Sequence, residues 1–170
     1  MKPALLMSLL VLLVGCASAP KPLQGEFAAV LPEQASGTQR AGDRVRWGGS
    51  IVRVEPAADR TCFEILGRDL GDAARPRLSG DSSVGRFLAC RSGFYDPAIF
   101  APDREITVTG RIDGFETRRI GEFDYRYPRI AAEVIYLWPE RSLADRRRLD
   151  PYWPHHPGYW WGGWRSPWWW

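Results

Sequence analysis

The residue types best suited to catalysis or metal binding occur in this 170-residue chain in patterns that support neither activity. The only two histidines, His155 and His156, are adjacent and lie in a segment rich in Pro, Gly and Trp. A closed zinc site needs about four ligands, so we expect both histidines to be solvated and assign no metal ligand. A Ser-His-Asp triad would have to recruit one of them from this segment. We therefore assign no catalytic residue and no cofactor, and predict that the chain is not an enzyme.

Two further patterns are predicted to be structural. The stretch "GDSSVG", Gly80 to Gly85, resembles a nucleophile loop but lies in a polar segment without a histidine nearby, so we expect a turn. Asp103 and Glu105 form an acid pair in the sequence. Acid–base catalysis also requires a concave site and matched pKa values, and neither is visible in a sequence.

The three cysteines carry chemistry of another kind. If Cys16 is modified, Cys62 and Cys90 remain as an even pair, which predicts a disulfide in an oxidising compartment. The two lie in predicted neighbouring strands that can pair antiparallel. Directly opposed residues would have Cα atoms about 4.5–5.5 Å apart, a distance that a disulfide can bridge.

The first 15 residues have the layout of an export signal. The apolar run Ala4–Val14 follows a basic residue and is too short to span a bilayer, which takes about 20 residues. The "LVGC" of Leu13–Cys16 resembles the lipobox of bacterial lipoproteins. That resemblance implies cleavage between Gly15 and Cys16 and a diacylglycerol on the Cys16 thiol; the alternative is an ordinary signal with an incidental Cys. Ala17, in place of Asp, implies sorting to the outer membrane.

Export and charge limit the partners. Removing the first 15 of 170 residues leaves 155, enough for one domain with tails, and lowers the formal charge from +3 to +2 because Lys2 is lost. A nearly balanced, exported chain is not expected to bind nucleic acid. The expected partner is the outer membrane, reached through lipid on Cys16. Two or three acyl chains, each contributing about 0.8 kcal/mol per buried CH₂, would hold it there.

The middle of the chain has the alternation of strands, and residues 41–140 are predicted to form one domain. Apolar residues occupy odd positions up to Ile51 and even positions, Val52 and Val54, after it. This shift close to Gly48 and Gly49 predicts a β-bulge. The fold class is predicted to be all-β, a small five-stranded OB-like barrel, with a sandwich as the alternative. The predicted strands cover residues 44–56, 60–67, 86–93, 105–116 and 129–139, and the predicted core includes Trp47, Phe87, Ile106, Val108 and Val134.

The flanks are predicted to be less regular. Residues 16–40 are expected to form a lipidated N-terminus and tether, in which the apolar stretch 27–31 can provide one short docking element. Residues 141–151 are predicted to form a short helix, because Ser142 and Asp145 have capping-box spacing. Residues 152–170 are predicted to be an unstructured Trp-rich tail, since their Pro and Gly residues prevent a regular element.

Several stretches together resemble a known family. "RWGGSIVRV", "GRFLACRSGFYDP", "ITVTGRIDG" and "YPRIAAEVIYLWP" follow the lipobox in the order found in the Slp (starvation lipoprotein) family of outer-membrane lipoproteins. The resemblance covers residues 26–140, and the family also shares an aromatic-rich C-terminal tail. It implies an outer-membrane lipoprotein linked to starvation or stationary-phase envelope maintenance, on the periplasmic face, with no enzymatic activity. The Cys62–Cys90 pair is not part of this motif and rests on chemistry alone.

The tail holds the remaining candidate contact residues. Trp is enriched at membrane interfaces because its ring is amphipathic, and aromatic rings also stack on sugars. The tail is thus expected to contact the membrane surface or the glycans of peptidoglycan or lipopolysaccharide, unless it is an unselected end. We predict a structural envelope lipoprotein; the alternatives are a periplasmic binding module for a glycan, lipid or peptide and, less favoured, a hydrolase. The candidate surface-contact residues are Trp160, Trp161, Trp164, Trp168, Trp169, Trp170, Arg146, Arg147 and Arg148.

Overall fold

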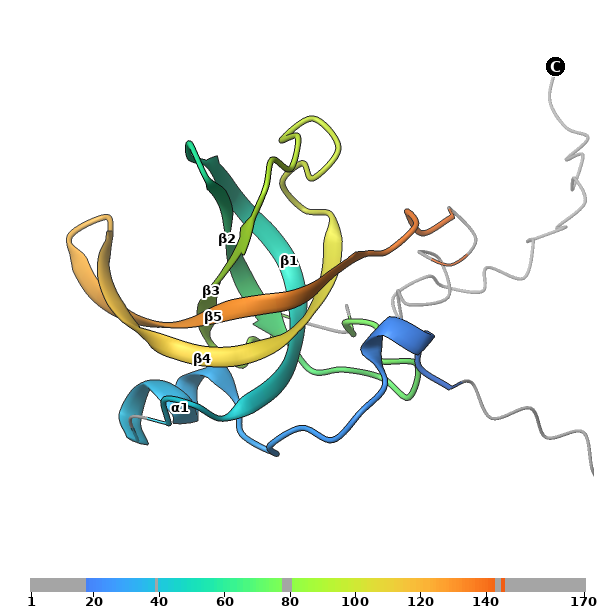
Figure 1. Cartoon of the computed structure of the whole chain (residues 1–170), viewed down its shortest axis with the longest axis horizontal. Helices are drawn as coiled ribbons and strands as arrows, with labels where there is room; N and C mark the ends of the chain where they lie inside the picture. Colours follow the sequence, from blue (N-terminus) through green and yellow to red (C-terminus); the bar gives the residue numbers. More distant parts are fainter. Residues whose placement is uncertain (1–17, 39, 78–80, 143–144, 146–170) are drawn as a thin grey trace, which may run out of the picture. The chain divides into compact units, whose positions relative to one another are not determined.

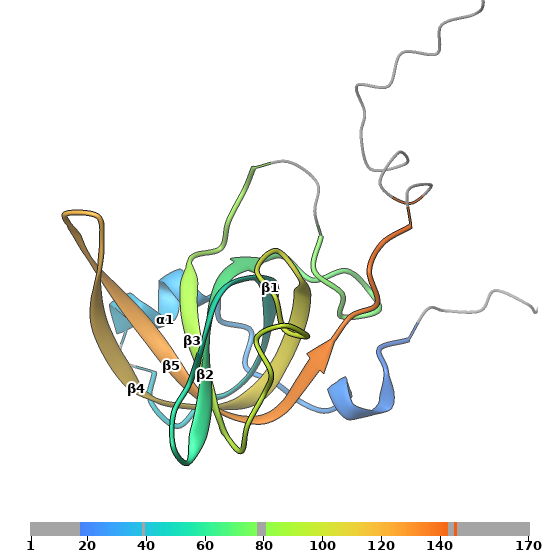
Figure 2. The ribbon, with the colours of Figure 1, turned by 90° about the horizontal axis from the view of Figure 1, so that it is seen from above.

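Five strands dominate the computed structural model, which describes residues 18–38, 40–77, 81–142 and 145. The chain divides into two units, Met1–Glu140 and Arg141–Trp170, and the strands belong to the first. They close into a barrel in the order β1-β2-β3-β5-β4 (Figures 1 and 2). The predicted small five-stranded barrel is confirmed, and the sandwich is excluded. The strands are β1 (Arg44–Pro56), β2 (Arg60–Arg68), β3 (Arg86–Ser92), β4 (Glu105–Ile120) and β5 (Phe123–Leu137).

Closure depends on β1, whose residues Gly48–Ser50 pair with strands on both sides, and on one short seam between β3 and β5. β1 pairs antiparallel with β4 over Arg44–Ser50 and with β2 over Gly48–Pro56. The seam is the pairing of β3 with β5, the one parallel pairing among the strands of the described barrel, and it joins Leu88–Cys90 to Arg129–Ala131. Every other neighbouring pair in the barrel order is antiparallel.

Glycines allow the close approach that this coiling requires. A Cβ on Gly49 would collide with the main-chain carbonyl of Leu66, and one on Gly110 would collide with that of Ala131. The β1–β2 register shifts between Ile51 and Arg53, so the bulge lies at the predicted change of parity. β4 has two more register shifts against β5, one of them at Gly110. The long strands therefore bend rather than run straight.

The barrel interior holds the main apolar core. Four of the five predicted core residues are buried there, namely Trp47, Phe87, Ile106 and Val108. Trp47 packs edge-on against Phe87, with ring centroids 5.3 Å apart. The fifth, Val134, is half-buried and packs outside this core, against a second cluster of Leu23, Ala74 and Trp138. This cluster, called the docking cluster below, had no separate signal in the sequence.

The β4–β5 hairpin is longer than predicted. Strand β4 continues to Ile120 and β5 begins at Phe123, where 116 and 129 were expected, so the hairpin projects beyond the barrel (Figure 1). On β4 the added residues 117–120 have no apolar alternation, whereas on β5 Phe123, Tyr125 and Tyr127 alternate with Asp124 and Arg126. The turn is closed by Gly121, whose φ of 61° suits glycine. Pro128, just before the predicted strand start, is paired with Phe115 inside the ladder.

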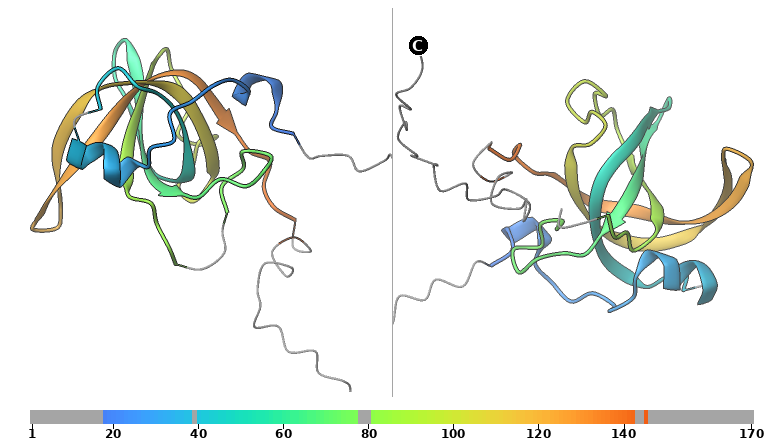
Figure 3. Two further views of the ribbon diagram at one scale, coloured as in Figure 1. Left: turned by 90° about the horizontal axis from the view of Figure 1, so that it is seen from below. Right: turned by 180° about the vertical axis from the view of Figure 1, so that it is seen from behind.

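The segment expected to be a tether instead packs on the barrel from Ala19 onward (Figure 3). It contains the 3₁₀ helix η2 (Lys21–Leu23) and the helix α1 (Pro32–Thr38). The short element therefore follows the apolar stretch 27–31 rather than coinciding with it. Val30 is buried in the main core, and its carbonyl accepts a 2.7 Å hydrogen bond from the indole N–H of Trp47. A buried indole N–H requires a hydrogen-bond acceptor. The Val30 carbonyl provides it, so this hydrogen bond holds the N-terminal segment against the barrel.

Candidate functional site

The N-terminal segment is attached to one end of the barrel by the docking cluster. Leu23 has no exposed surface and packs with Ala74 and Trp138, while Ala19 lies against the same cluster. The Arg46 guanidinium donates a 2.8 Å hydrogen bond to the Leu23 carbonyl. The Gln24 amide donates one of 2.7 Å to the Ala19 carbonyl. The chain is thus fixed to the barrel only three residues after Cys16.

Trp138 fixes the end of β5 at the same place. Its indole N–H donates to Thr107 Oγ1 at 2.9 Å, and that hydroxyl donates to the Ala74 carbonyl at 2.7 Å. The Arg75 guanidinium lies over the indole ring, 5.4 Å from its centroid, and also pairs with the buried carboxylate of Glu105. Arg75 further donates to the carbonyl of Pro139 at 2.7 Å. The polar atoms of this cluster are therefore satisfied.

The predicted cleavage and lipidation residues Gly15 and Cys16 lie outside the described residues, as do both histidines. The same holds for all the candidate surface-contact residues, namely Arg146, Arg147, Arg148, Trp160, Trp161, Trp164, Trp168, Trp169 and Trp170. Of the predicted helix 141–151, Ser142 and Asp145 make the hydrogen bonds of a capping box. The Asp145 N–H donates to Ser142 Oγ at 3.2 Å, and the Ser142 N–H donates to the Asp145 carboxylate at 3.2 Å.

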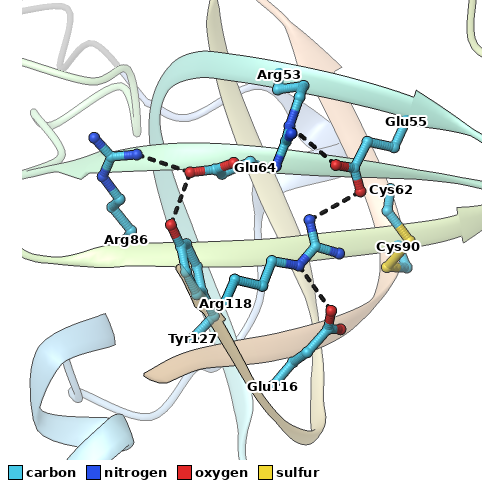
Figure 4. Close-up of polar contacts among 9 residues, drawn as sticks. All are labelled: Arg53, Glu55, Cys62, Glu64, Arg86, Cys90, Glu116, Arg118 and Tyr127. Atoms are coloured by element: carbon cyan, nitrogen blue, oxygen red, sulfur yellow. Dashed lines mark hydrogen bonds and ion pairs between the residues drawn. A yellow bond between two sulfur atoms is a disulfide. The ribbon is translucent and has the colours of Figure 1, made fainter. Parts of the chain in front are cut away.

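Cys62 and Cys90 are brought together on the face of the sheet that points away from the barrel core. They oppose each other directly in the β2–β3 ladder and form a disulfide, with Cα atoms 4.1 Å apart (Figure 4). This is slightly closer than the expected distance. Phe63, the next residue along β2, is buried in the core, so the alternation of the strand places Cys62 on the opposite face.

A buried carboxylate lies on the same outer face, two residues along β2. Glu64 is only 5% exposed. It accepts hydrogen bonds from the Tyr127 hydroxyl at 2.8 Å, from Arg86 at 2.7 Å and from Arg53 at 3.1 Å (Figure 4). This site was not predicted from the sequence. Its one signal was an acidic residue between the core residues Phe63 and Ile65.

These contacts set the pKa values of the group. Burial alone would raise the pKa of Glu64, but the hydrogen bonds from Tyr127 and Arg86, with the charge of Arg53, outweigh it and lower that pKa below 4.5. Burial and the adjacent carboxylate raise the pKa of Tyr127 to about 12. A carboxylate that is stabilised in its charged form and already accepts three donors is a weak general base.

A second ion-pair group joins the projecting hairpin to β1. Arg118 contacts Glu116 at 2.7 Å and Glu55 at 2.9 Å, and Arg53 contacts Glu55 at 3.0 Å (Figure 4). Because Arg53 also contacts Glu64, the two groups form one outer-face network that connects all five strands. It consists of Arg53, Glu55, Glu64, Arg86, Glu116, Arg118 and Tyr127.

Other surface features are weaker candidates. A pocket of about 480 Å³ lies where residues 28–32 cross β1, and Arg46, Trp47 and Arg68 contribute to its walls. In the part of the chain that the structure describes, three large apolar side chains are exposed: Phe94, Ile99 and Phe123. Residues 18–38, 40–77, 81–142 and 145 hold no group of three potential metal ligands. No helix among them has the length and apolar character needed to cross a bilayer.

The comparisons with known proteins identify the family. The model of the outer membrane lipoprotein Slp family matches residues 13–170, and this chain belongs to that family. The outer membrane protein Slp of Escherichia coli (strain K12) is 27% identical over 98% of this chain and 90% of its own length. An uncharacterized protein of Haemophilus influenzae is 29% identical over 78% of this chain and 74% of its own length.

The match extends beyond the 26–140 resemblance seen in the sequence, since it includes the predicted lipobox and the tail. Family membership supports a location in the outer membrane. A small single-stranded DNA-binding protein from Streptomyces coelicolor aligns with 61% of this chain and 96% of its own at 13% identity and a TM-score of 0.35. That similarity is too low to indicate function.

Loss of the disulfide should destabilise the barrel. The bridge joins residues separated by 28 positions, and chain entropy predicts a cost of about 3–4 kcal/mol when such a loop is opened. We expect the Cys62→Ser/Cys90→Ser variant to lose this much free energy of unfolding in urea. A thiol assay on denatured wild-type protein from the periplasm should find both residues blocked; two free thiols would contradict the bridge.

Glu64 should make stability depend on acid pH. Its pKa is lower in the folded than in the unfolded protein, so its contribution is complete above about pH 4.5 and is lost as the pH falls through the folded value. Glu64→Gln should therefore cost about 1–3 kcal/mol at pH 7, with a smaller difference from wild type at pH 3.

Glu133→Gln is the matched control, because the Glu133–Arg44 pair is half-exposed and such pairs contribute little. Urea unfolding of the three proteins at both pH values provides the measurement. A pH-independent cost at Glu64 would contradict the proposed origin of its stabilising effect.

Proposed function

We propose that this chain is a non-catalytic lipoprotein of the outer membrane, anchored on its periplasmic face by acyl chains on Cys16, with a structural role in the envelope. The observation that carries the proposal is the family match, which begins at Leu13 and so includes the residues of the lipobox. Because the chain belongs to the Slp family, whose members resemble starvation lipoproteins, we extend the proposed role to envelope maintenance during starvation or stationary phase.

The buried charges support a non-catalytic role. Among the described residues two carboxylates are buried, Glu64 and Glu105. A glycosidase-like or acid–base mechanism would need two carboxyl groups facing one cleft. Here each is paired with its own arginine, Glu64 with Arg86 and Glu105 with Arg75, on different strands. Both carboxylates thus stabilise the barrel.

We also propose that the barrel is OB-like. Two features support this: five strands in the order β1-β2-β3-β5-β4, and closure by a parallel β3–β5 pairing. An OB-like barrel carries no function by itself, since unrelated activities use the same fold.

Replacing the lipidation residue tests the anchor. Cys16→Ser should abolish palmitate labelling and globomycin-sensitive processing, because the thiol that accepts the lipid is lost. The variant should leave the outer-membrane fraction while its barrel unfolds at the same temperature as that of the wild type. A variant that still fractionates with the outer membrane would show that the lipobox interpretation is wrong.

We propose that the Trp-rich residues 152–170, with Arg146–Arg148, contact the membrane surface. Adding anionic vesicles should shift the Trp emission of an unlipidated protein to the blue, as indoles leave water. Deleting 152–170 should remove this shift and leave the melting temperature unchanged. Pull-downs on peptidoglycan and lipopolysaccharide test the glycan alternative: retention there with no shift on vesicles would replace the membrane by a glycan as partner.

A further inference from the structure

The most informative feature beyond the proposed function is the shortness of the chain between Cys16 and the folded barrel. Among the described residues, Ala19 is the first that packs on the docking cluster, and it lies three residues after Cys16 in the sequence. A fully extended chain spans at most about 3.5 Å per residue, or about 10 Å over three residues. A lipid on Cys16 would leave the barrel almost no freedom to move away from the bilayer.

One end of the barrel must then be nearest the lipid. This end, called the anchor pole below, consists of η2, the turn Gly71–Arg75 and the end of β5 at Leu137–Trp138. Its parts are joined by the docking cluster and by the turn's own hydrogen bonds, from Gly71 N–H to the Arg75 carbonyl and from Ala74 N–H to the Gly71 carbonyl. The anchor pole is therefore one rigid surface.

The second flank of the barrel leaves from the same surface. Trp138 is buried in the docking cluster, and the next two residues contact arginines, Pro139 with Arg75 of the anchor pole and Glu140 with Arg104, which precedes β4. The chain continues from here into residues 141–170, whose sequence carries three consecutive arginines and seven tryptophans, six of them in 160–170. The predicted lipidated N-terminus and the Trp-rich C-terminal segment are thus both connected to the barrel at the anchor pole.

We infer that the anchor pole lies flat against the inner leaflet of the outer membrane, so that the barrel has one orientation with the β4–β5 hairpin pointing into the periplasm. The partner of this surface is the lipid headgroup layer. η2 and the tip of the hairpin lie at opposite ends of the barrel (Figures 1 and 3). β4 itself runs 16 residues from Glu105, beside Trp138, to Ile120 at the tip. The inference rests on the proposed lipidation of Cys16.

Fluorescence quenching in vesicles tests this orientation with the full-length lipidated protein. Asp72 and Glu122 are matched positions, since both are exposed acidic residues in turns, one at the anchor pole and one at the hairpin tip. Asp72→Cys and Glu122→Cys would each carry an environment-sensitive dye on the single free thiol, because Cys62 and Cys90 are paired. The vesicles contain phosphatidylethanolamine, phosphatidylglycerol and a headgroup-nitroxide lipid as quencher.

We expect at least threefold stronger quenching at position 72 than at position 122. Inserting a 20-residue Gly/Ser linker between Ala17 and Ser18 should remove most of this difference, because such a linker has a root-mean-square span of about 25 Å. Equal quenching at the two positions without the linker, or stronger quenching at 122, would overturn the orientation.

Different results would contradict the proposed lipid anchor and the proposed orientation. Mass spectrometry of the N-terminal peptide and flotation with the vesicles report on Cys16 before any quenching is measured. Absence of the acyl mass would overturn both the lipid anchor and the orientation that depends on it. An acylated, floating protein with equal quenching would overturn the orientation alone.

Discussion

Closure of the sheet through β1 is the constraint on which the rest of the structure depends. β1 must pair with β4 along its first half and with β2 along its second half, and both pairings include Gly48–Ser50. At that overlap β1 coils so tightly that Gly49 lies against the carbonyl of Leu66 with no room for a side chain. The bulge that follows turns the remaining residues of β1 toward β2. Without this local geometry β3 and β5 would not meet.

Closure also explains where the polar residues are buried. A five-stranded barrel has a small interior, which Trp47, Phe87 and their apolar neighbours fill. The outer face is covered where the β4–β5 hairpin curves back toward β1, and Glu64 is buried there. The desolvation cost of this burial is offset because Tyr127, Arg86 and Arg53 satisfy the carboxylate oxygens. The disulfide, on the same face, links β2 to β3, the strand that carries the seam.

Sequence patterns predicted the barrel because apolar alternation and glycine position depend on local geometry. β1 was predicted with its observed bounds, and Cys62 and Cys90 were placed opposite each other from strand pairing alone. The hairpin extension was missed because its β4 part, residues 117–120, has no apolar alternation, although Phe123, Tyr125 and Tyr127 alternate with polar residues along β5. The docked N-terminal segment was missed because Leu23 is a single apolar residue among prolines, and its partners Ala74 and Trp138 are distant in the sequence. Networks such as that around Glu64 combine residues from several strands, which a linear pattern cannot show.

The unequal lengths of the strand pairings determine how the barrel can open. β3 and β5 pair along Leu88–Cys90 and Arg129–Ala131 only, whereas β4 and β5 pair along most of their length. Since few main-chain hydrogen bonds hold the seam, local unfolding begins there at the lowest free energy. An opened barrel would remain one continuous antiparallel sheet in the order β3-β2-β1-β4-β5. We therefore expect the seam to be the last pairing to form during folding, because it joins only Leu88–Cys90 to Arg129–Ala131 and gains little until the other strands are in place.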